Sequence, residues 1–275
     1  MLKIGLSSCS KTLDERFFED CAAAGIAAVE LSPGDTPEAL NYPALARFAD
    51  AAGVALWSLH LPFMPFDEID VSALDKEMRK KSVERDRALI ERAADVGVGV
   101  FVLHASGEPI TDAERAERFA CAEESVSALA RTAAVCGGIL AVEDLPRTCL
   151  GRNSEEMLRL TAVDPNAKIC FDTNHLLGEP IPDFIRAVGD RIVTTHVSDY
   201  DFIDEKHWLP GEGGINWQEL YQTLLDTGYR GPWLYELGFT SPRTRRRCRN
   251  LTCADFARNA NEIFTGQPLT VLPTM

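Results

Sequence analysis

Six short, mostly apolar segments of this chain each end in a histidine or a carboxylate. They are Leu56–His60, Val100–His104, Ile139–Glu143, Ile169–Asp172, Ile192–His196 and Trp233–Glu236. Segments of this length and composition are typical of buried strands. Parallel strands end together at one edge of their sheet, so a polar residue repeated at that position surrounds one shared centre. The sequence therefore predicts a parallel sheet with a functional site at its C-terminal edge.

Strand-like segments alternate with helix-like segments along the whole chain. Strands are expected at 3–8, 27–31, 54–60, 99–104, 138–143, 168–172, 191–196 and 232–237. Helices are expected at 12–25, 43–53, 71–97, 111–137, 154–163, 181–188 and 216–227, with a last one from residue 252. Three of these helices are expected to start at the capping sequences Thr12-x-x-Glu15, Thr111-x-x-Glu114 and Thr252-x-x-Asp255.

The strands are too apolar to expose one face to water, so helices are expected to cover the sheet. Eight strand-then-helix units close naturally into a barrel, because closure leaves no unpaired edge. The length of 275 residues suits such a barrel, which needs about 250. The alternative is an open doubly wound sheet, but no Gly-x-Gly-x-x-Gly motif follows the first strand. We therefore expect an α/β fold, a single (β/α)8 TIM barrel that forms one domain over residues 1–275.

The charge balance is acidic, since 28 Lys and Arg against 42 Asp and Glu give −14. Such a field repels nucleic-acid phosphates, and the one basic cluster, residues 243–249, has no interleaved aromatic residues, so no nucleic-acid partner is expected. No run of 18 or more apolar residues predicts a membrane span. The chain enters its first strand without a signal-peptide pattern, and its eight cysteines form no Cys-x-x-Cys pair. We expect a cytoplasmic protein with reduced thiols.

The last four strands of the expected barrel would present Glu143, Asp172, His196 and Glu236 around one point. Three carboxylates cannot crowd together in a partly dry site without a cation, so we expect one divalent ion there. The oxygen-rich ligand set favours Mn²⁺, with Mg²⁺, Co²⁺ or Zn²⁺ as alternatives, and the absence of cysteine argues against a structural zinc site. A single strand-end carboxylate is more often a helix cap or a salt-bridge partner. Repetition at six strand ends argues against that explanation here.

The chain resembles the xylose isomerase-like barrel superfamily of sugar isomerases and epimerases, which also includes endonuclease IV. The resemblance covers nearly the whole chain. It rests on Glu143 in AVEDLP, Asp172 and His175 in FDTNH, His196 in HVSD, His207–Gly213 in HWLPGEG and Glu236 in LYEL. In epimerases of this family, the positions that match Glu143, Asp172, His196 and Glu236 hold the divalent ion. The position that matches His175 contacts the substrate.

The resemblance implies an enzyme of carbohydrate metabolism, a metal-dependent isomerase or epimerase of a ketose or related polyol sugar. The reaction would pass through a metal-stabilised cis-enediolate, with Glu143 and Glu236 as the acid and base. His60, His104, His175 and His207 would line the substrate pocket. Because members of this family commonly associate, the resemblance is also compatible with a homo-oligomer.

One departure concerns the arginine that ketose 3-epimerases carry shortly after the histidine matching His196. This chain has Ser198, Asp199, Tyr200 and Asp201 there. Arg147, in the loop after Glu143, is an alternative contact for a substrate oxygen or carboxylate, although simple solvent exposure explains it as well. The basic cluster at 243–249 follows the last strand, where barrels often bind phosphate, so a phosphorylated sugar and a solvated surface are both open.

Three other functions remain open from the sequence. A multi-zinc phosphodiester hydrolase similar to endonuclease IV would use positions that match His60, His104, Glu143, Asp172, His175, His196, His207 and Glu236, with Glu205 in place of an aspartate. An inosose dehydratase shares the enolate chemistry. A barrel that has lost catalysis would show a damaged ligand set, whereas all four expected metal ligands are present.

Overall fold

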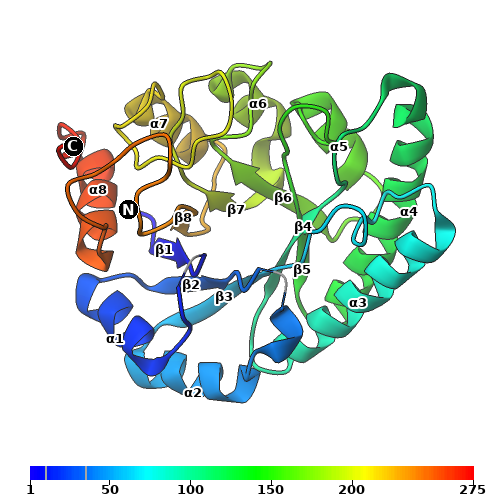
Figure 1. Cartoon of the computed structure of the whole chain (residues 1–275), viewed down its shortest axis with the longest axis horizontal. Coiled ribbons are helices and arrows are strands. Elements are labelled where there is room, and N and C mark those ends of the chain that lie inside the picture. Colours follow the sequence, from blue (N-terminus) through cyan, green and yellow to red (C-terminus); the bar gives the residue numbers. More distant parts are fainter. Residues whose placement is uncertain (10, 35) are drawn as a thin grey trace.

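The computed structural model describes residues 1–9, 11–34 and 36–275. Within these residues, eight parallel strands form an inner layer and eight α-helices an outer layer. The strands are β1 (Ile4–Ser7), β2 (Ala28–Leu31), β3 (Ala55–His60), β4 (Val100–His104), β5 (Ile139–Glu143), β6 (Ala167–Asp172), β7 (Ile192–His196) and β8 (Trp233–Tyr235). The helices are α1 (Glu15–Ala24), α2 (Tyr42–Ala52), α3 (Lys76–Ala94), α4 (Asp112–Val135), α5 (Ser154–Thr161), α6 (Ile181–Val188), α7 (Trp217–Asp226) and α8 (Cys253–Thr265). Figure 1 shows the helices following one another around the strands in chain order, which confirms the (β/α)8 TIM barrel.

Neighbouring strands pair in the order β7-β6-β5-β4-β3-β2-β1-β8. The ring closes just beyond the end of β7, where Val197 forms a parallel bridge with Tyr235. The amide of Val197 donates to the carbonyl of Leu234 over 2.8 Å, and the amide of Glu236 donates to the carbonyl of Val197 over 3.2 Å. This closure brings the residue that follows β8 beside the end of β7.

Side chains alternate between the two faces of each strand. On β4 and β5, Phe101, Leu103, Leu140 and Val142 point outward and join the large core between strands and helices. The inward positions form a smaller cluster that fills the barrel, made of Val100, Val102, Ala141 and Cys170 with Trp57 and Val193 against it. Continuing the same alternation, the next inward positions toward the C-terminal ends are polar.

Helix starts follow the capping expectations in part. Thr111 accepts a hydrogen bond from the amide of Glu114, and Thr252 and Asp255 form a reciprocal capping box, as expected. The expectation for Thr12 is wrong, because Asp14 is the N-cap of α1 and accepts from the amide of Phe17. The helix expected from residue 71 begins only at Lys76, after the N-cap Asp75. None of the helices in the described part of the chain is long and apolar enough to cross a membrane.

Candidate active site

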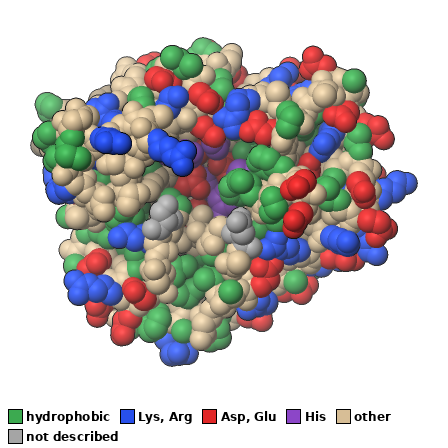
Figure 2. Space-filling model, viewed as in Figure 1, with side chains coloured by type: hydrophobic (Ala, Val, Ile, Leu, Met, Phe, Trp, Pro, Cys, Tyr) green, Lys and Arg blue, Asp and Glu red, His purple; other side chains and the backbone are tan. Residues whose placement is uncertain are grey.

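The site is built by the last inward position of several neighbouring strands. His60 ends β3, His104 ends β4, Glu143 ends β5, Asp172 ends β6 and His196 ends β7. The register pairs His104 with Glu143 and Asp172 with His196, so these residues stand at matching heights in the barrel wall. Figure 2, seen from the same side as Figure 1, shows histidine and acidic side chains at the bottom of a central hollow.

The four expected metal ligands come together. Glu143, Asp172, His196 and Glu236 each offer one ligand atom, and these four atoms lie within 4.8 Å of one another. His196 Nδ1 lies 3.1 Å from Glu143 Oε1 and 3.3 Å from Glu236 Oε2. Within the described residues, Asp172 Oδ2 is buried without a hydrogen-bond partner. Such an orphaned oxygen in a group of three carboxylates is what a bound cation would satisfy.

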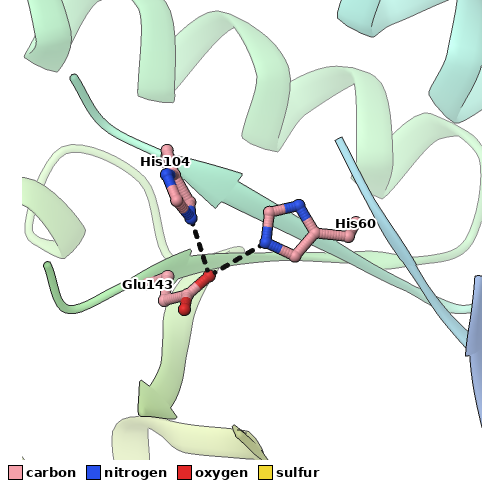
Figure 3. A group of neighbouring side chains, drawn as sticks. All are labelled: His60, His104 and Glu143. Carbon is pink, nitrogen blue, oxygen red and sulfur yellow. Dashed lines mark hydrogen bonds and ion pairs between the residues drawn. The ribbon is translucent and has the colours of Figure 1, made fainter. Parts of the chain in front are cut away.

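The other carboxylate oxygen of Glu143 contacts two further histidines, His60 and His104. Glu143 Oε2 lies 3.2 Å from Nε2 of His60 and 3.2 Å from Nε2 of His104. Figure 3 shows both rings directed at this one oxygen from β3 and β4. The ring of Phe63 stacks on His104 with 4.2 Å between centroids. His60 and His104 therefore lie beside the four-ligand group through their contacts with Glu143, and their ligand atoms with that of Glu143 form another possible cation group.

The two histidines on Glu143 differ in their pKa. Burial by itself lowers the pKa of His60, but the hydrogen bond to Glu143 and the nearby carboxylates outweigh it and raise that pKa to about 9. For His104 burial dominates and lowers the pKa to about 4, although Glu143 opposes the shift. The Nδ1–H of His60 donates to the carbonyl of Leu61 over 2.8 Å, which leaves Nε2 facing Glu143.

The pKa values of the carboxyl groups in the site are shifted in opposite directions. Burial alone would raise the pKa of Glu143, but His196 and His104 hold it well below its ordinary value. Burial raises the pKa of Glu236, which also lies near Glu143, and burial raises the pKa of Asp172. The geometry thus concentrates negative charge at one point while only some of it is balanced by imidazole.

His175 belongs to a third group, nearer the rim. Its Nδ1–H donates to the carbonyl of Asp144 over 2.8 Å, so Nε2 faces outward, 3.3 Å from Glu205 Oε2. The ligand atoms of His175, Glu205 and His207 lie within 4.8 Å of one another. His207 adopts a positive φ of 50°, in the left-handed region, and its ring meets that of His175 edge-on. The expected pocket residues His175 and His207 therefore lie side by side.

Arg147 lies at the same rim, held by acidic side chains. Its guanidinium contacts Glu108, Asp204 at 2.8 Å and Glu205 at 3.1 Å, which ties the loops after β4, β5 and β7 together. The backbone of Arg147 has a positive φ of 53°. Arg147 thus contacts Glu205, which in turn contacts His175, and the structure places the arginine beside the expected pocket.

The HVSD and PGEG segments form one structural unit. Asp199 accepts hydrogen bonds from the amides of Gly211, Gly213 and Ile215, and from the indole N–H of Trp217. A Cβ on Gly213 would lie 2.3 Å from Asp199 Oδ1, so only glycine fits that turn. The motif therefore shapes the loop that carries His207.

The basic cluster at 243–249 is largely occupied by contacts within the chain. Arg247 is fully buried and binds both oxygens of Glu212, at 2.9 and 2.7 Å. Arg245 lies 3.4 Å from the same carboxylate, and Arg249 binds Asp255 at 2.6 Å. These pairs stabilise the loop after β8, so the three arginines already have anionic partners.

Two buried acidic residues near the site, Glu30 and Asp144, are not predicted as site residues from the sequence. Glu30 on β2 is fully buried and contacts His196 Nε2 at 3.0 Å. Its signal was present in the sequence, because Glu30 interrupts the apolar strand segment at 27–31. Asp144 was also missed, and its Oδ1 accepts a hydrogen bond from the amide of Asp172 over 2.7 Å.

Three curated proteins are similar to part of this chain. Fructoselysine 3-epimerase of Shigella flexneri is 24% identical over 169 residues, which are 59% of this chain and 61% of that protein. The uncharacterized protein MJ1311 of Methanocaldococcus jannaschii is 28% identical over 61% of this chain and 60% of its own length. D-psicose 3-epimerase of Enterocloster bolteae is 30% identical over 119 residues, 39% of this chain and 36% of that protein. This chain thus matches less than two thirds of the length of these curated relatives.

Solved structures share the fold over nearly the full length. A D-tagatose 3-epimerase-like protein superposes with a TM-score of 0.78 at 23% identity, covering 96% of each chain. D-psicose 3-epimerase from Clostridium cellulolyticum H10 superposes with a TM-score of 0.73 at 21% identity, covering 96% of this chain and 92% of that one. The family model described as xylose isomerase-like TIM barrel matches residues 18–249. The chain belongs to the xylose isomerase-like TIM barrel family.

Proposed function

We propose that this protein is a divalent-metal-dependent isomerase or epimerase that acts on a ketose or a related polyol sugar. The observation that carries the proposal is the convergence of Glu143, Asp172, His196 and Glu236, whose ligand atoms lie within 4.8 Å of one another. The similarity to fructoselysine 3-epimerase and D-psicose 3-epimerase supports a ketose as the substrate class.

The residues present fit a divalent ion. Three carboxylates repel one another when buried together, and Asp172 Oδ2 has no hydrogen-bond partner among the described residues. Three oxygen donors with one imidazole favour Mn²⁺, with Co²⁺, Mg²⁺ or Zn²⁺ as alternatives. When bound, such an ion acts as a Lewis acid that stabilises negative charge on the oxygens of a sugar losing a proton beside its carbonyl.

The chain's own residues would move that proton. Epimerisation needs one group to take the proton and another to return it, and Glu143 and Glu236 are the proposed pair. Both approach His196 Nδ1, but Glu236 reaches further into the hollow, with 14% of its side chain exposed against 1% for Glu143. Nε2 of His175 faces outward, and we assign it to a substrate oxygen. His60, His104 and His207 would orient hydroxyl groups, with Arg147 at the rim.

The test is proton exchange in deuterated water, followed by NMR over a panel of ketoses, inososes and their phosphates. Label entry without loss of water supports the proposal, whereas a keto product that has lost water would identify an inosose dehydratase. Glu143→Gln and Glu236→Gln should each reduce label entry by about 100-fold or more. Glu262→Gln is the matched control, because Glu262 lies on α8 and accepts hydrogen bonds from Thr270. Undiminished exchange in both active-site variants would remove Glu143 and Glu236 from the proposed roles.

A second candidate function rests on a separate observation. Besides the four-ligand group, His60, His104 and Glu143 form one further group of ligand atoms, and His175, Glu205 and His207 form another. Several closely spaced ions support phosphodiester hydrolysis, the chemistry of an endonuclease IV-like enzyme. The net charge of −14 favours a small phosphodiester over nucleic acid as its substrate. Elemental analysis separates the two: one tightly bound ion per chain favours the epimerase, and three zinc ions favour the hydrolase.

A further inference from the structure

Glu30 is an acidic residue buried below the proposed metal ligands. Glu30 lies on β2, where the pairing with β3 shifts register between Val29 and Glu30. Both Val29 and Leu31 join the outer core, so Glu30 between them faces the barrel interior. The residue has no exposed surface. A carboxylate in such a place costs free energy unless a specific partner offsets the loss of water.

The partner of Glu30 is the one imidazole of the four-ligand group. Glu30 Oε2 lies 3.0 Å from His196 Nε2 and also accepts a hydrogen bond from the hydroxyl of Ser58 over 2.8 Å. Its Oε1 has no hydrogen-bond partner within the described residues. Because only one of its two oxygens is satisfied, a contribution to barrel stability does not explain why a carboxylate is buried here. The contact with His196 does explain it.

This contact determines which nitrogen of His196 faces the other ligands. A carboxylate accepts, so it selects the form of the ring in which Nε2 carries the hydrogen. With an ion in the site, Nδ1 would present its lone pair to that ion, on the side where Glu143 Oε1 lies 3.1 Å and Glu236 Oε2 lies 3.3 Å from the ring nitrogen. In metal sites generally, an acceptor behind a histidine fixes the orientation of the ring and increases the basicity of the ligating nitrogen.

We propose that Glu30 is a positioning residue that fixes His196 as an Nδ1 ligand of the divalent ion, with Ser58 holding the carboxylate in place. The inference rests on the metal site of the proposed function. Glu30 itself lies behind the ring and contacts His196 and Ser58 instead of the three carboxylate ligands. Its role therefore concerns metal affinity before any substrate is present.

The first test measures Mn²⁺ binding without substrate, by competition with a fluorescent chelator. Glu30→Gln keeps the size of the side chain but removes its charge, and it should raise the dissociation constant for Mn²⁺ by about 10–100-fold. Glu262→Gln, the same change on α8, should leave the constant unchanged. A Glu30→Gln protein that binds Mn²⁺ within twofold of the wild type would overturn the role of Glu30 alone. A wild-type protein that takes up none of Mn²⁺, Co²⁺, Mg²⁺ and Zn²⁺ would overturn the metal site, and the inference with it.

The second test needs no Glu30 variant, so it holds even if Glu30→Gln does not fold. The ¹⁵N-labelled protein is loaded with Zn²⁺ as a diamagnetic ion, and long-range ¹H–¹⁵N spectra report the tautomer of each histidine. The His196 signals are identified by their absence in His196→Gln. Nε2 should carry the hydrogen and Nδ1 should not. A hydrogen on Nδ1 of His196 would contradict the proposal directly.

Discussion

At the scale of single residues, Asp86 shows how burial without a partner affects stability. Asp86 lies on the buried face of α3 and has no exposed surface. Neither of its carboxyl oxygens has a hydrogen-bond partner among the described residues. Burial therefore raises the pKa of Asp86 well above its ordinary value, although the charge of Arg85 opposes the shift.

The pH dependence of stability follows from that shift. Below a pH of about 4, Asp86 is protonated in both the folded and the unfolded chain. Above about pH 4, the Asp86 carboxyl ionises in the unfolded chain but stays protonated in the folded one. Its contribution to the free energy of unfolding therefore declines as the pH rises toward the pKa of the folded state. We expect Asp86→Asn to remove this decline. Urea unfolding of wild type and variant at pH 4.5 and pH 8 measures it, and an equal decline in both proteins would contradict the assignment.

Residue positions inside the barrel could be predicted from the sequence, because alternation along a strand is local. His60, His104, Glu143, Asp172 and His196 all occupy the strand ends that were expected for them. Contacts of Arg147 could not be predicted, since Glu108, Asp204 and Glu205 reach it from two other loops. Glu30 was overlooked because it lies inside a strand segment and not at its end.

At the scale of elements, the loop between β7 and α7 depends on Asp199. This buried carboxylate accepts hydrogen bonds from the amides of Gly211, Gly213 and Ile215 and from the indole of Trp217. Asp199→Ala would leave these donors unsatisfied, at about 1–3 kcal/mol for each that finds no water. We expect the free energy of unfolding to fall by about 3–5 kcal/mol and the loop to become sensitive to protease.

A neighbouring aspartate provides the control for that change. Asp201 accepts from the amide of Ile203, but it lies nearer the surface and its side chain is 32% exposed. Asp201→Asn should therefore cost less than about 1 kcal/mol. Urea unfolding with limited proteolysis distinguishes the two variants. Comparable losses in both would show that Asp199 does not organise the loop.

The start of α8 gives a second prediction at this scale. Asp255 caps the helix with Thr252 and binds Arg249 and Arg258, and the hydrogen bond from Arg249 is the largest cause that lowers its pKa. Because the folded pKa is depressed, this stability is present above pH 4 and is lost as the pH falls below that value. Asp255→Asn should cost about 2 kcal/mol at pH 7 and less at pH 3, where part of the contribution is already lost. Urea unfolding at both pH values measures the loss in free energy of unfolding. A loss that is the same at pH 7 and pH 3 would contradict this role of the Asp255 carboxylate.

Element boundaries were predictable where the cap is local. Thr111 and Thr252 cap their helices as the sequence indicated. The start of α3 at Lys76 was not predictable from charge and periodicity. Asp70 and Ser72 in the preceding segment are instead bound to Arg118 of α4, a contact distant in sequence. Tertiary contacts of this kind override a local helix signal.

At the scale of the whole molecule, closure of the barrel brings the first and last residues of the proposed metal-ligand set together. The bridge between Val197 and Tyr235 places Glu236 beside His196, although 40 positions separate them in the sequence. The proposed ligands come from separate strands, so a bound ion would link segments that are distant in the sequence. Metal binding should therefore stabilise the whole fold and not one element.

At a free Mn²⁺ concentration about 100 times its dissociation constant, binding should raise the free energy of unfolding by about 2.7 kcal/mol. For a chain of this size that corresponds to a rise in Tm of about 5 °C over the chelator-treated protein. Thermal unfolding with and without Mn²⁺ measures it, and Asp172→Asn should lose most of the rise. A rise of the same size in Asp172→Asn would place the ion elsewhere.

The dependence of proton exchange on the bound ion tests the proposed function most sharply. Deuterium entry into the ketose that reacts best is measured in the purified protein, after removal of metal by a chelator, and after Mn²⁺ is added back. We predict that exchange disappears on chelation, returns with Mn²⁺ in the wild type, and does not return in Asp172→Asn. Full exchange in a protein shown by elemental analysis to be free of metal would contradict a metal-dependent reaction at this site.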